Sequence, residues 1–142
     1  YAGAAHAVRK VVAMAPHVFI EPVCISSIKQ AVSTFETTDF AQKLGRYHRD
    51  VRKTFYGWAD VWRDPDFERW DIRDDYLPNV RCPVLAIQGH DDEYGTMAQL
   101  DEIGRRVAGP SELLKLERCG HSPFRDQPEA VLEKIAAFVM AP

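Results

Sequence analysis

The sequence predicts an α/β fold built on a parallel sheet of about three strands. Short apolar runs that suit buried strands alternate with segments whose apolar residues recur at helical spacing. The order is strand, helical insertion, strand, helix, strand, helix, which favours parallel strands joined by right-handed crossovers. We therefore expect a three-layer partial sheet with flanking helices and a helical insertion.

The 142 residues divide into three expected segments. Residues 1–21 hold the end of an alanine-rich helix and the first core strand. Residues 22–78 form a helical insertion, in which one helix face carries aromatic and aliphatic residues at helical spacing. Residues 79–142 return to alternating core strands and helices. The three expected strands are Val8–Phe19, Val84–Gly89 and Glu112–Arg118, and Pro16 should mark the end of the first.

Two capping boxes are expected where the last two helices begin. Thr96 is followed by Gln99, and Asp126 is followed by Glu129. In a capping box, the side chain three residues into the helix returns to the first backbone N–H. This spacing predicts that the polar side chains serve the helix ends.

Composition and charge exclude several classes of function. A net charge of −3 argues against nucleic acid or an anionic membrane surface as a partner. No apolar run approaches the roughly 20 residues that a membrane-spanning helix needs. Three cysteines without a C-x-x-C pair favour reduced thiols in the cytoplasm over a disulfide framework. The histidines lack the spacing of a metal site, so no metal is expected.

Polar residues follow two neighbouring strands at the point where each strand ends. One turn reads Gly-His-Asp-Asp and ends at Asp92, and the other reads Gly-His and ends at His121. Because ligands bind outside the carboxyl ends of parallel strands, these turns should line one cleft. A carboxylate there can accept the imidazole N–H, fix its tautomer and stabilise the imidazolium during proton transfer. We therefore expect His121 to be a general base oriented by a carboxylate.

The segments PVLAIQGHDDEYG (83–95) and LLKLERCGHSPFRDQPEAVLEKIAAFV (113–139) resemble the C-terminal part of an α/β-hydrolase. In that family the triad acid lies on the Gly-x-x-Asp turn, which matches Asp92, and the triad histidine matches His121. An offset of one residue leaves Asp91 as the alternative acid. The resemblance implies hydrolysis of a small-molecule ester, lactone or related bond, with no cofactor. It also implies that residues 22–78 are a helical cap insertion, or lid, over the active site.

The nucleophile of that family is absent from these residues. It normally occupies a Gly-x-Ser-x-Gly turn, and no such motif occurs in the sequence. We expect it upstream, as Ser, Asp or Cys, so the isolated chain should be inactive or nearly so. Four residues of the chain are weaker alternatives, because a nucleophile must come within hydrogen-bond reach of its base. They are Cys24, Ser26, Ser27 and Ser122.

Four aromatic residues are candidate contacts of the substrate. Trp58 and Trp62 belong to the expected cap, where their alternative role is to pack the cap helices. Phe124 follows the histidine turn. His17 follows the first strand, where it could reach the cleft or remain a solvated loop histidine.

The first strand is expected to lack its usual neighbour, which leaves an apolar sheet edge. The chain begins with Tyr1 in what looks like the middle of a helix. We therefore expect either a missing N-terminal half within a larger polypeptide or a homodimer that buries this edge. The alternative function is that of a truncated, non-catalytic module that dimerises.

Overall fold

The computed structural model describes residues 8–141, and it forms two compact units. The sheet unit comprises Tyr1–Phe19 and Asp71–Pro142, and the helical unit comprises Ile20–Trp70. The helix end expected at residues 1–7 lies outside the described residues.

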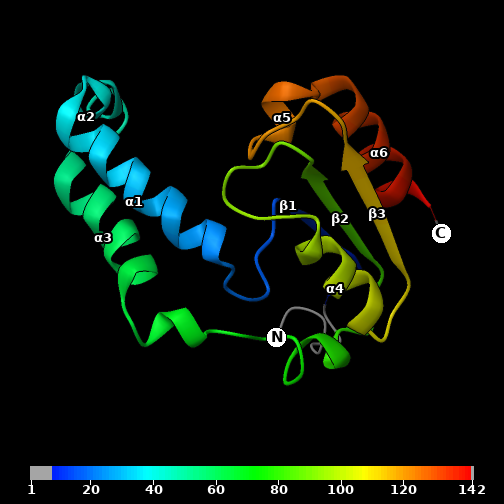
Figure 1. The fold of residues 1–142 in the computed structure, drawn as a ribbon. Helices are drawn as coiled ribbons and strands as arrows, with labels where there is room; N and C mark the ends of the chain where they lie inside the picture. Colours follow the sequence, from blue (N-terminus) through cyan, green and yellow to red (C-terminus); the bar gives the residue numbers. More distant parts are fainter. Residues whose placement is uncertain (1–7, 142) are drawn as a thin grey trace. The chain divides into compact units, whose positions relative to one another are not determined.

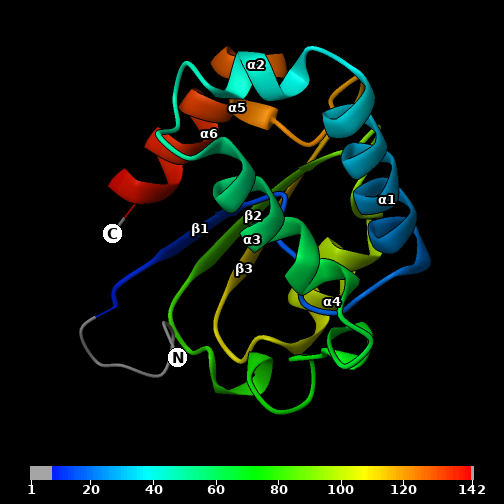
Figure 2. The ribbon, with the colours of Figure 1, turned by 90° about the vertical axis from the view of Figure 1, so that its left-hand side faces the viewer.

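The sheet unit holds three parallel strands in the order β1-β2-β3, as Figures 1 and 2 show. They are β1 (Val11–Met14), β2 (Val84–Gly89) and β3 (Ser111–Leu116). Their register aligns Ala13 with Ala86 and Ala86 with Leu113. The predicted parallel sheet of three strands is therefore confirmed.

Strand β1 is shorter than the predicted range Val8–Phe19. The chain leaves the strand at Ala15, whose φ of 45° lies in the left-handed region. The Ala15 N–H still donates to the Ile87 carbonyl at 2.8 Å, so the turn begins while the chain is held against β2. Pro16 follows and cannot continue the ladder, because it has no N–H.

The two faces of β2 pack against different helices. All six residues of β2 are buried, which is the pattern of a central parallel strand. Val84 and Ala86 pack with residues of helix α4 (Ala98–Arg106). Leu85 and Ile87 pack with residues of helix α6 (Pro128–Met140). Since successive side chains of a strand point to opposite faces, α4 and α6 cover opposite sides of the sheet. Two short helical turns complete the unit, η2 (Leu77–Asn79) and α5 (Pro123–Asp126).

The predicted cap at the start of α4 is present at Thr96. The Thr96 hydroxyl accepts from the Ala98 N–H at 3.2 Å. The Gln99 side chain, which was expected to complete a capping box, has tertiary partners. It accepts from the Val18 N–H at 2.7 Å and donates to the Phe19 carbonyl at 3.1 Å.

At the second helix start, α6 has Gln127 as its N-cap residue and no side-chain cap. The Asp126 carboxylate accepts from the Gly120 N–H at 2.8 Å. It therefore stabilises the turn before His121 and does not cap α6.

The helical unit is held together by aromatic packing. It contains α1 (Pro22–Thr37), α2 (Phe40–Leu44), α3 (Val51–Arg63) and the short turn η1 (Phe67–Arg69). Helices α1 and α3 run side by side (Figure 1). The rings of Phe35 and Phe55 stack between them with centroids 3.9 Å apart. Ala59 is fully buried one turn later, where its small side chain permits close approach of the helices.

Gly89 ends β2 in contact with the turn that follows β3. A Cβ atom at this position would lie 1.8 Å from the Cys119 carbonyl oxygen. Because that atom belongs to the backbone, no rotamer change could relieve the overlap. The absence of a side chain at Gly89 therefore allows the two turns to meet.

We predict that Gly89→Ala destabilises the chain by at least about 2 kcal/mol, because the two turns must move apart. Urea unfolding followed by circular dichroism measures the change. Gly57→Ala is the matched control, since its Cβ would have no atom within 4 Å in α3. That control should stabilise the helix by up to about 1 kcal/mol. Equal stability of Gly89→Ala and the parent chain would contradict the close approach.

Candidate functional site

Backbone hydrogen bonds join the turn after β2 to the turn after β3. The His90 N–H donates to the Leu116 carbonyl at 2.8 Å, and the Asp91 N–H donates to the Cys119 carbonyl at 2.9 Å. The first bond continues the parallel ladder, and the second connects the loops. The two polar turns predicted from the sequence therefore lie together at the carboxyl edge of the sheet.

Asp92 and His121 form a hydrogen-bonded pair at this edge. His121 Nδ1 lies 3.0 Å from Asp92 Oδ1 and 3.1 Å from Asp92 Oδ2. The Asp92 side chain is fully buried, whereas 37% of the His121 side chain remains exposed. An ionised carboxylate only accepts, so Nδ1 must carry the proton and Nε2 is the basic nitrogen of the neutral ring.

Two further donors orient the Asp92 carboxylate. The Tyr94 N–H donates to Oδ1 at 2.9 Å, and Gln88 Nε2 donates to Oδ2 at 3.1 Å. Both oxygens thus have a partner other than His121. Gln88 at the end of β2 and the Tyr94 backbone on the loop of Asp92 therefore fix the plane of the carboxylate independently of the imidazole.

The pKa values of the two groups move in opposite directions. Burial is the largest influence on Asp92 and would raise its pKa. The hydrogen bonds from His121, Tyr94 and Gln88, with the charge of His121, outweigh burial and hold the pKa of Asp92 below its ordinary value. For His121, the hydrogen bond to Asp92 raises the pKa above its ordinary value despite burial, and the charges of Asp92 and Glu93 add to this.

Two rings lie beside His121. The Tyr94 ring meets it edge-on with centroids 4.7 Å apart, and the His17 ring lies 6.2 Å away. Burial, the largest influence, raises the pKa of Tyr94, and nearby carboxylates add to this, so its hydroxyl stays protonated. Gly95 leaves room for His17, because a Cβ there would lie 3.0 Å from His17 Cε1.

The structure brings together three of the predicted site residues, Asp92, His121 and His17. Asp91, the alternative acid, is exposed and contributes a backbone bond to the turn. His90 is directed to Glu117, with Nε2 3.4 Å from the carboxylate oxygen. Asp92 therefore has the contacts of an orienting acid, and its catalytic role remains a prediction.

The other predicted substrate contacts lie on helices α5 and α3. Phe124 lies on α5 and is 56% exposed. Trp58 and Trp62 belong to the helical unit, where Trp58 meets Phe55 edge-on and Trp62 meets Phe67 edge-on. Packing accounts for part of each tryptophan surface, and a role in binding remains a prediction.

Sequence reasoning missed Gln88 and Tyr94 as members of the site. Gln88 is a polar residue inside a strand that is otherwise apolar, and this contrast is the signal that could have identified it. Tyr94 lies two residues after Asp92 on the same turn. A carboxylate often accepts the backbone N–H two residues ahead, which brings that residue close to the acid.

Two of the weaker candidates for the nucleophile bond to the backbone beside them. Ser26 donates its hydroxyl to the Val23 carbonyl at 3.0 Å, and the buried Cys24 sulfur accepts from the Glu21 N–H at 3.3 Å. Within the described part of the sheet unit, no serine or cysteine side chain forms a hydrogen bond with His121. This unit therefore presents no activated hydroxyl or thiol to the acid–base pair.

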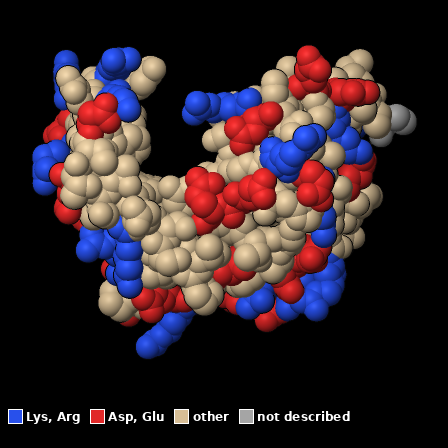
Figure 3. All heavy atoms as spheres, turned by 45° about the horizontal axis from the view of Figure 1, so that its top comes forward, with Lys and Arg blue, Asp and Glu red and all other residues tan. Residues whose placement is uncertain are grey.

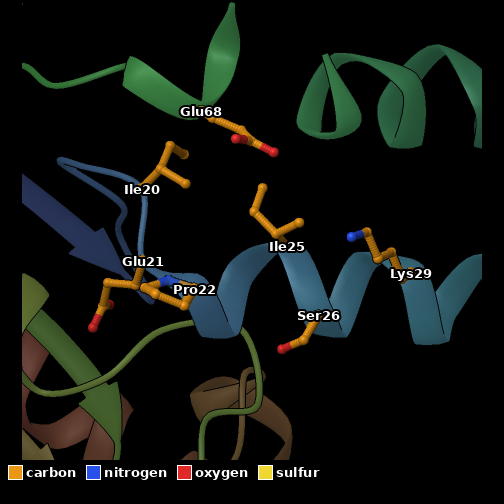
Figure 4. Close-up of a pocket in the computed structure, with 7 residues that line it drawn as sticks. All are labelled: Ile20, Glu21, Pro22, Ile25, Ser26, Lys29 and Glu68. Atoms are coloured by element: carbon orange, nitrogen blue, oxygen red, sulfur yellow. The ribbon is translucent and has the colours of Figure 1, made fainter. Parts of the chain in front are cut away.

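The helical unit contains a pocket of about 440 Å³ near the start of α1 (Figure 4). Its wall combines aliphatic side chains with two carboxylates and one ammonium group. The lining residues are Ile20, Glu21, Pro22, Ile25, Ser26, Lys29 and Glu68.

No group of three His, Cys, Asp or Glu side chains in the described part of the chain could hold a metal ion. Among its helices, none has the length and apolar character required to cross a membrane. Lys and Arg side chains are interspersed with Asp and Glu on the face that Figure 3 draws.

Solved structures with the same arrangement of strands and helices are hydrolases. A serine hydrolase involved in carbazole degradation aligns with 93% of this chain at a TM-score of 0.64 and 17% identity. The enol-lactonase from Burkholderia xenovorans LB400 aligns with 98% at a TM-score of 0.63 and 20% identity. A bacterial membrane phospholipase A aligns with 96% at a TM-score of 0.66 and 14% identity. The chain has the α/β-hydrolase fold.

The α/β-hydrolase fold is only partly represented in these 142 residues. The chain spans 54% of the carbazole-pathway hydrolase, 60% of the enol-lactonase and 51% of the phospholipase. No protein-family model matches the sequence, and no curated protein is significantly similar to it. At these identities the likeness shows the fold, and the activity must be argued from the site.

The opposite pKa shifts predict how the pair contributes to stability. The raised pKa of His121 stabilises the fold below the ordinary value of 6.5, and this contribution is lost as pH rises through the raised value. The lowered pKa of Asp92 stabilises the fold above 3.8, and this contribution is lost as pH falls through the lowered value. The contribution of the pair is therefore largest between these two pH values.

We predict that Asp92→Asn lowers the pKa of His121 and reduces the loss of stability between pH 5 and pH 8. Both follow because the largest influence that raises this pKa is removed. NMR titration of the imidazole and urea unfolding at the two pH values provide the measurements. Asp91→Asn is the matched control and should change neither. An unchanged pKa of His121 in Asp92→Asn would show that the hydrogen bond does not form in solution.

Proposed function

We propose that the chain supplies the acid and the base of a serine-type α/β-hydrolase that acts on a small-molecule ester, lactone or related bond. The observation that carries this proposal is the contact of the buried Asp92 carboxylate with His121 Nδ1. This contact leaves Nε2 as the nitrogen that can accept a proton. A histidine with no catalytic role does not require a buried carboxylate as its partner, because burial of that charge costs free energy.

In this role His121 Nε2 removes the proton from the nucleophile as the nucleophile attacks the substrate carbonyl. The imidazolium that forms is stabilised by the Asp92 carboxylate, which remains ionised. The same proton then passes to the leaving oxygen, and a water molecule hydrolyses the acyl intermediate by the reverse sequence. The raised pKa of His121 favours the proton acceptance that the first step needs.

We propose that the nucleophile and the N–H donors of the oxyanion hole come from residues outside these 142. The absence of Gly-x-Ser-x-Gly from the sequence supports this. So does the absence of a serine or cysteine bonded to His121 within the described part of the sheet unit. The 142-residue chain by itself should therefore hydrolyse esters little faster than the buffer does.

The substrate is proposed to be small and neutral or weakly polar. Tyr94 and His17 border His121 and offer ring surfaces for such a molecule. The helical unit is proposed to act as a cap that contributes Trp58 and Trp62, and Phe124 is proposed as a further contact. Hydrolases of this fold include an enol-lactonase and an enzyme of carbazole degradation, which supports a small organic substrate.

The edge of β1 is proposed to pair with a further strand. Within the described residues β1 is hydrogen-bonded to β2 on one side only. In the hydrolase reading, the partner strand belongs to the N-terminal half of the same fold. In the alternative reading, the chain is a non-catalytic module and a second copy covers this edge. Light scattering distinguishes them, since the homodimer would have twice the chain mass of 16.1 kDa.

We predict that the protein expressed from the complete reading frame hydrolyses p-nitrophenyl esters or lactones, and that His121→Ala lowers kcat/KM by about 10³–10⁴-fold. Asp92→Asn should lower it by a similar order, because the imidazole loses its tautomer and its counter-charge. Steady-state kinetics over a panel of esters and lactones provides the measurement.

Two controls lie on the turn that carries Asp92. His90→Ala and Asp91→Asn should each retain activity within about threefold, since neither side chain contacts His121. Full activity in His121→Ala would disprove the proposed function. Loss of activity in Asp91→Asn, with Asp92→Asn unaffected, would reassign the acid to Asp91.

A further inference from the structure

Gln88 is a buried polar residue at the end of the most buried strand. It is 1% exposed, and its neighbours on β2 are Ile87 and Gly89. Its amide nitrogen makes two hydrogen bonds, to Asp92 Oδ2 at 3.1 Å and to the Gly95 carbonyl at 2.8 Å. Both acceptors lie on the loop that carries the acid of the site.

The amide oxygen of Gln88 is buried without a hydrogen-bond partner among the described residues. A buried acceptor without a partner is unfavourable, and an apolar side chain of similar size would avoid that cost. Packing therefore does not explain why a glutamine occupies this position. The two bonds made by the amide nitrogen are the interactions that require it.

The orientation of the amide follows from its neighbours. Asp92 Oδ2 and the Gly95 oxygen are both acceptors, so only the NH₂ group can face them. Rotation of the amide by half a turn would place three oxygens together. The unpartnered oxygen is thus a direct consequence of directing both N–H groups of Gln88 to the acid loop.

We propose that Gln88 is a positioning residue for the Asp92–His121 pair. It holds Oδ2 while the Tyr94 N–H holds Oδ1, so the carboxylate cannot rotate about its own axis. Through the Gly95 carbonyl it also fixes the far end of the loop, next to Tyr94. This inference rests on the proposed function, because it concerns the same two residues.

Gln99 offers a matched comparison within the same unit. It is also fully buried, but its amide oxygen accepts from the Val18 N–H and its nitrogen donates to the Phe19 carbonyl. These bonds join α4 to the segment after β1 and do not reach Asp92. Substitution of Gln99 therefore reproduces the loss of a buried amide without the loss of a donor to the acid.

The test compares Gln88→Met with Gln99→Met in the 142-residue chain, with the pKa of Asp92 measured by carbon NMR of the carboxyl group. Gln88→Met should raise the pKa of Asp92, because a donor to the charged form is lost. It should also speed solvent exchange of the His121 Nδ1 proton. Gln99→Met should change neither. An Asp92 pKa that is the same in Gln88→Met as in the parent would overturn the proposal.

A measurement on the parent chain covers the case in which Gln88→Met does not fold. The side-chain amide protons of Gln88 should shift as Asp92 titrates, since one of them is bonded to Oδ2. Amide protons that do not respond to this titration would overturn the proposal as well.

Activity of the complete enzyme adds a third readout. Gln88→Met should reduce kcat on the order of tenfold to hundredfold with little change in KM, because the base is misplaced and binding is not. Unchanged kcat would overturn the positioning role. Both NMR readouts are independent of turnover, so a failure of the proposed hydrolase function would be recognised separately.

Discussion

The close approach of Gly89 to the Cys119 carbonyl is the constraint on which the candidate site depends. It brings the turn after β2 against the turn after β3, and the Asp91 N–H bonds to the same carbonyl. Once the two turns are in contact, the side chains that follow each of them are within reach of one another. Asp92 and His121 therefore come within hydrogen-bond distance because Gly89 has no side chain to separate the two turns. Their hydrogen bond adds to the backbone contact between these turns.

Burial of a carboxylate is the second condition of the site. An uncompensated buried charge costs several kcal/mol, and each hydrogen bond to a charged group restores about 1.5–3 kcal/mol. Asp92 accepts from His121, Gln88 and the Tyr94 backbone, so its charge is compensated from three directions. The result is an acid that stays ionised and keeps its orientation, while its partner stays partly open to solvent. A general base of this kind requires both properties, a fixed ionised acid on one side of the imidazole and access to the other side.

Much of the sheet unit could be predicted from the sequence because its signals are local. Apolar runs that end in glycine indicated β2 and β3, and polar residues after them indicated Asp92 and His121. The predictions failed where a local pattern competed with a tertiary partner. Gln99 has capping-box spacing, yet it accepts from the Val18 N–H of a distant segment, and Asp126 accepts from the Gly120 N–H of the preceding turn. No local signal distinguishes these outcomes.

Two further features had no periodic signal at all. Pro16 indicated the end of strand β1, but the turn already starts at Ala15, whose positive φ glycine would have indicated and alanine does not. The two bonds of Gln88 depend on the path of the loop from Asp92 to Gly95, which spacing does not describe. The role of a residue such as Gln88 can be recognised only when the hydrogen-bond partners of its buried polar atoms are known.

The central claim is that Asp92 holds His121 with its proton on Nδ1 and leaves Nε2 basic. Nitrogen NMR of the ¹⁵N-labelled chain, recorded above the pKa of His121, reports the tautomer directly. The account predicts a protonated Nδ1 coupled to a bare Nε2, with this preference lost in Asp92→Asn. A neutral ring protonated on Nε2 in the parent chain would contradict it, because a carboxylate cannot donate a proton to a bare Nδ1.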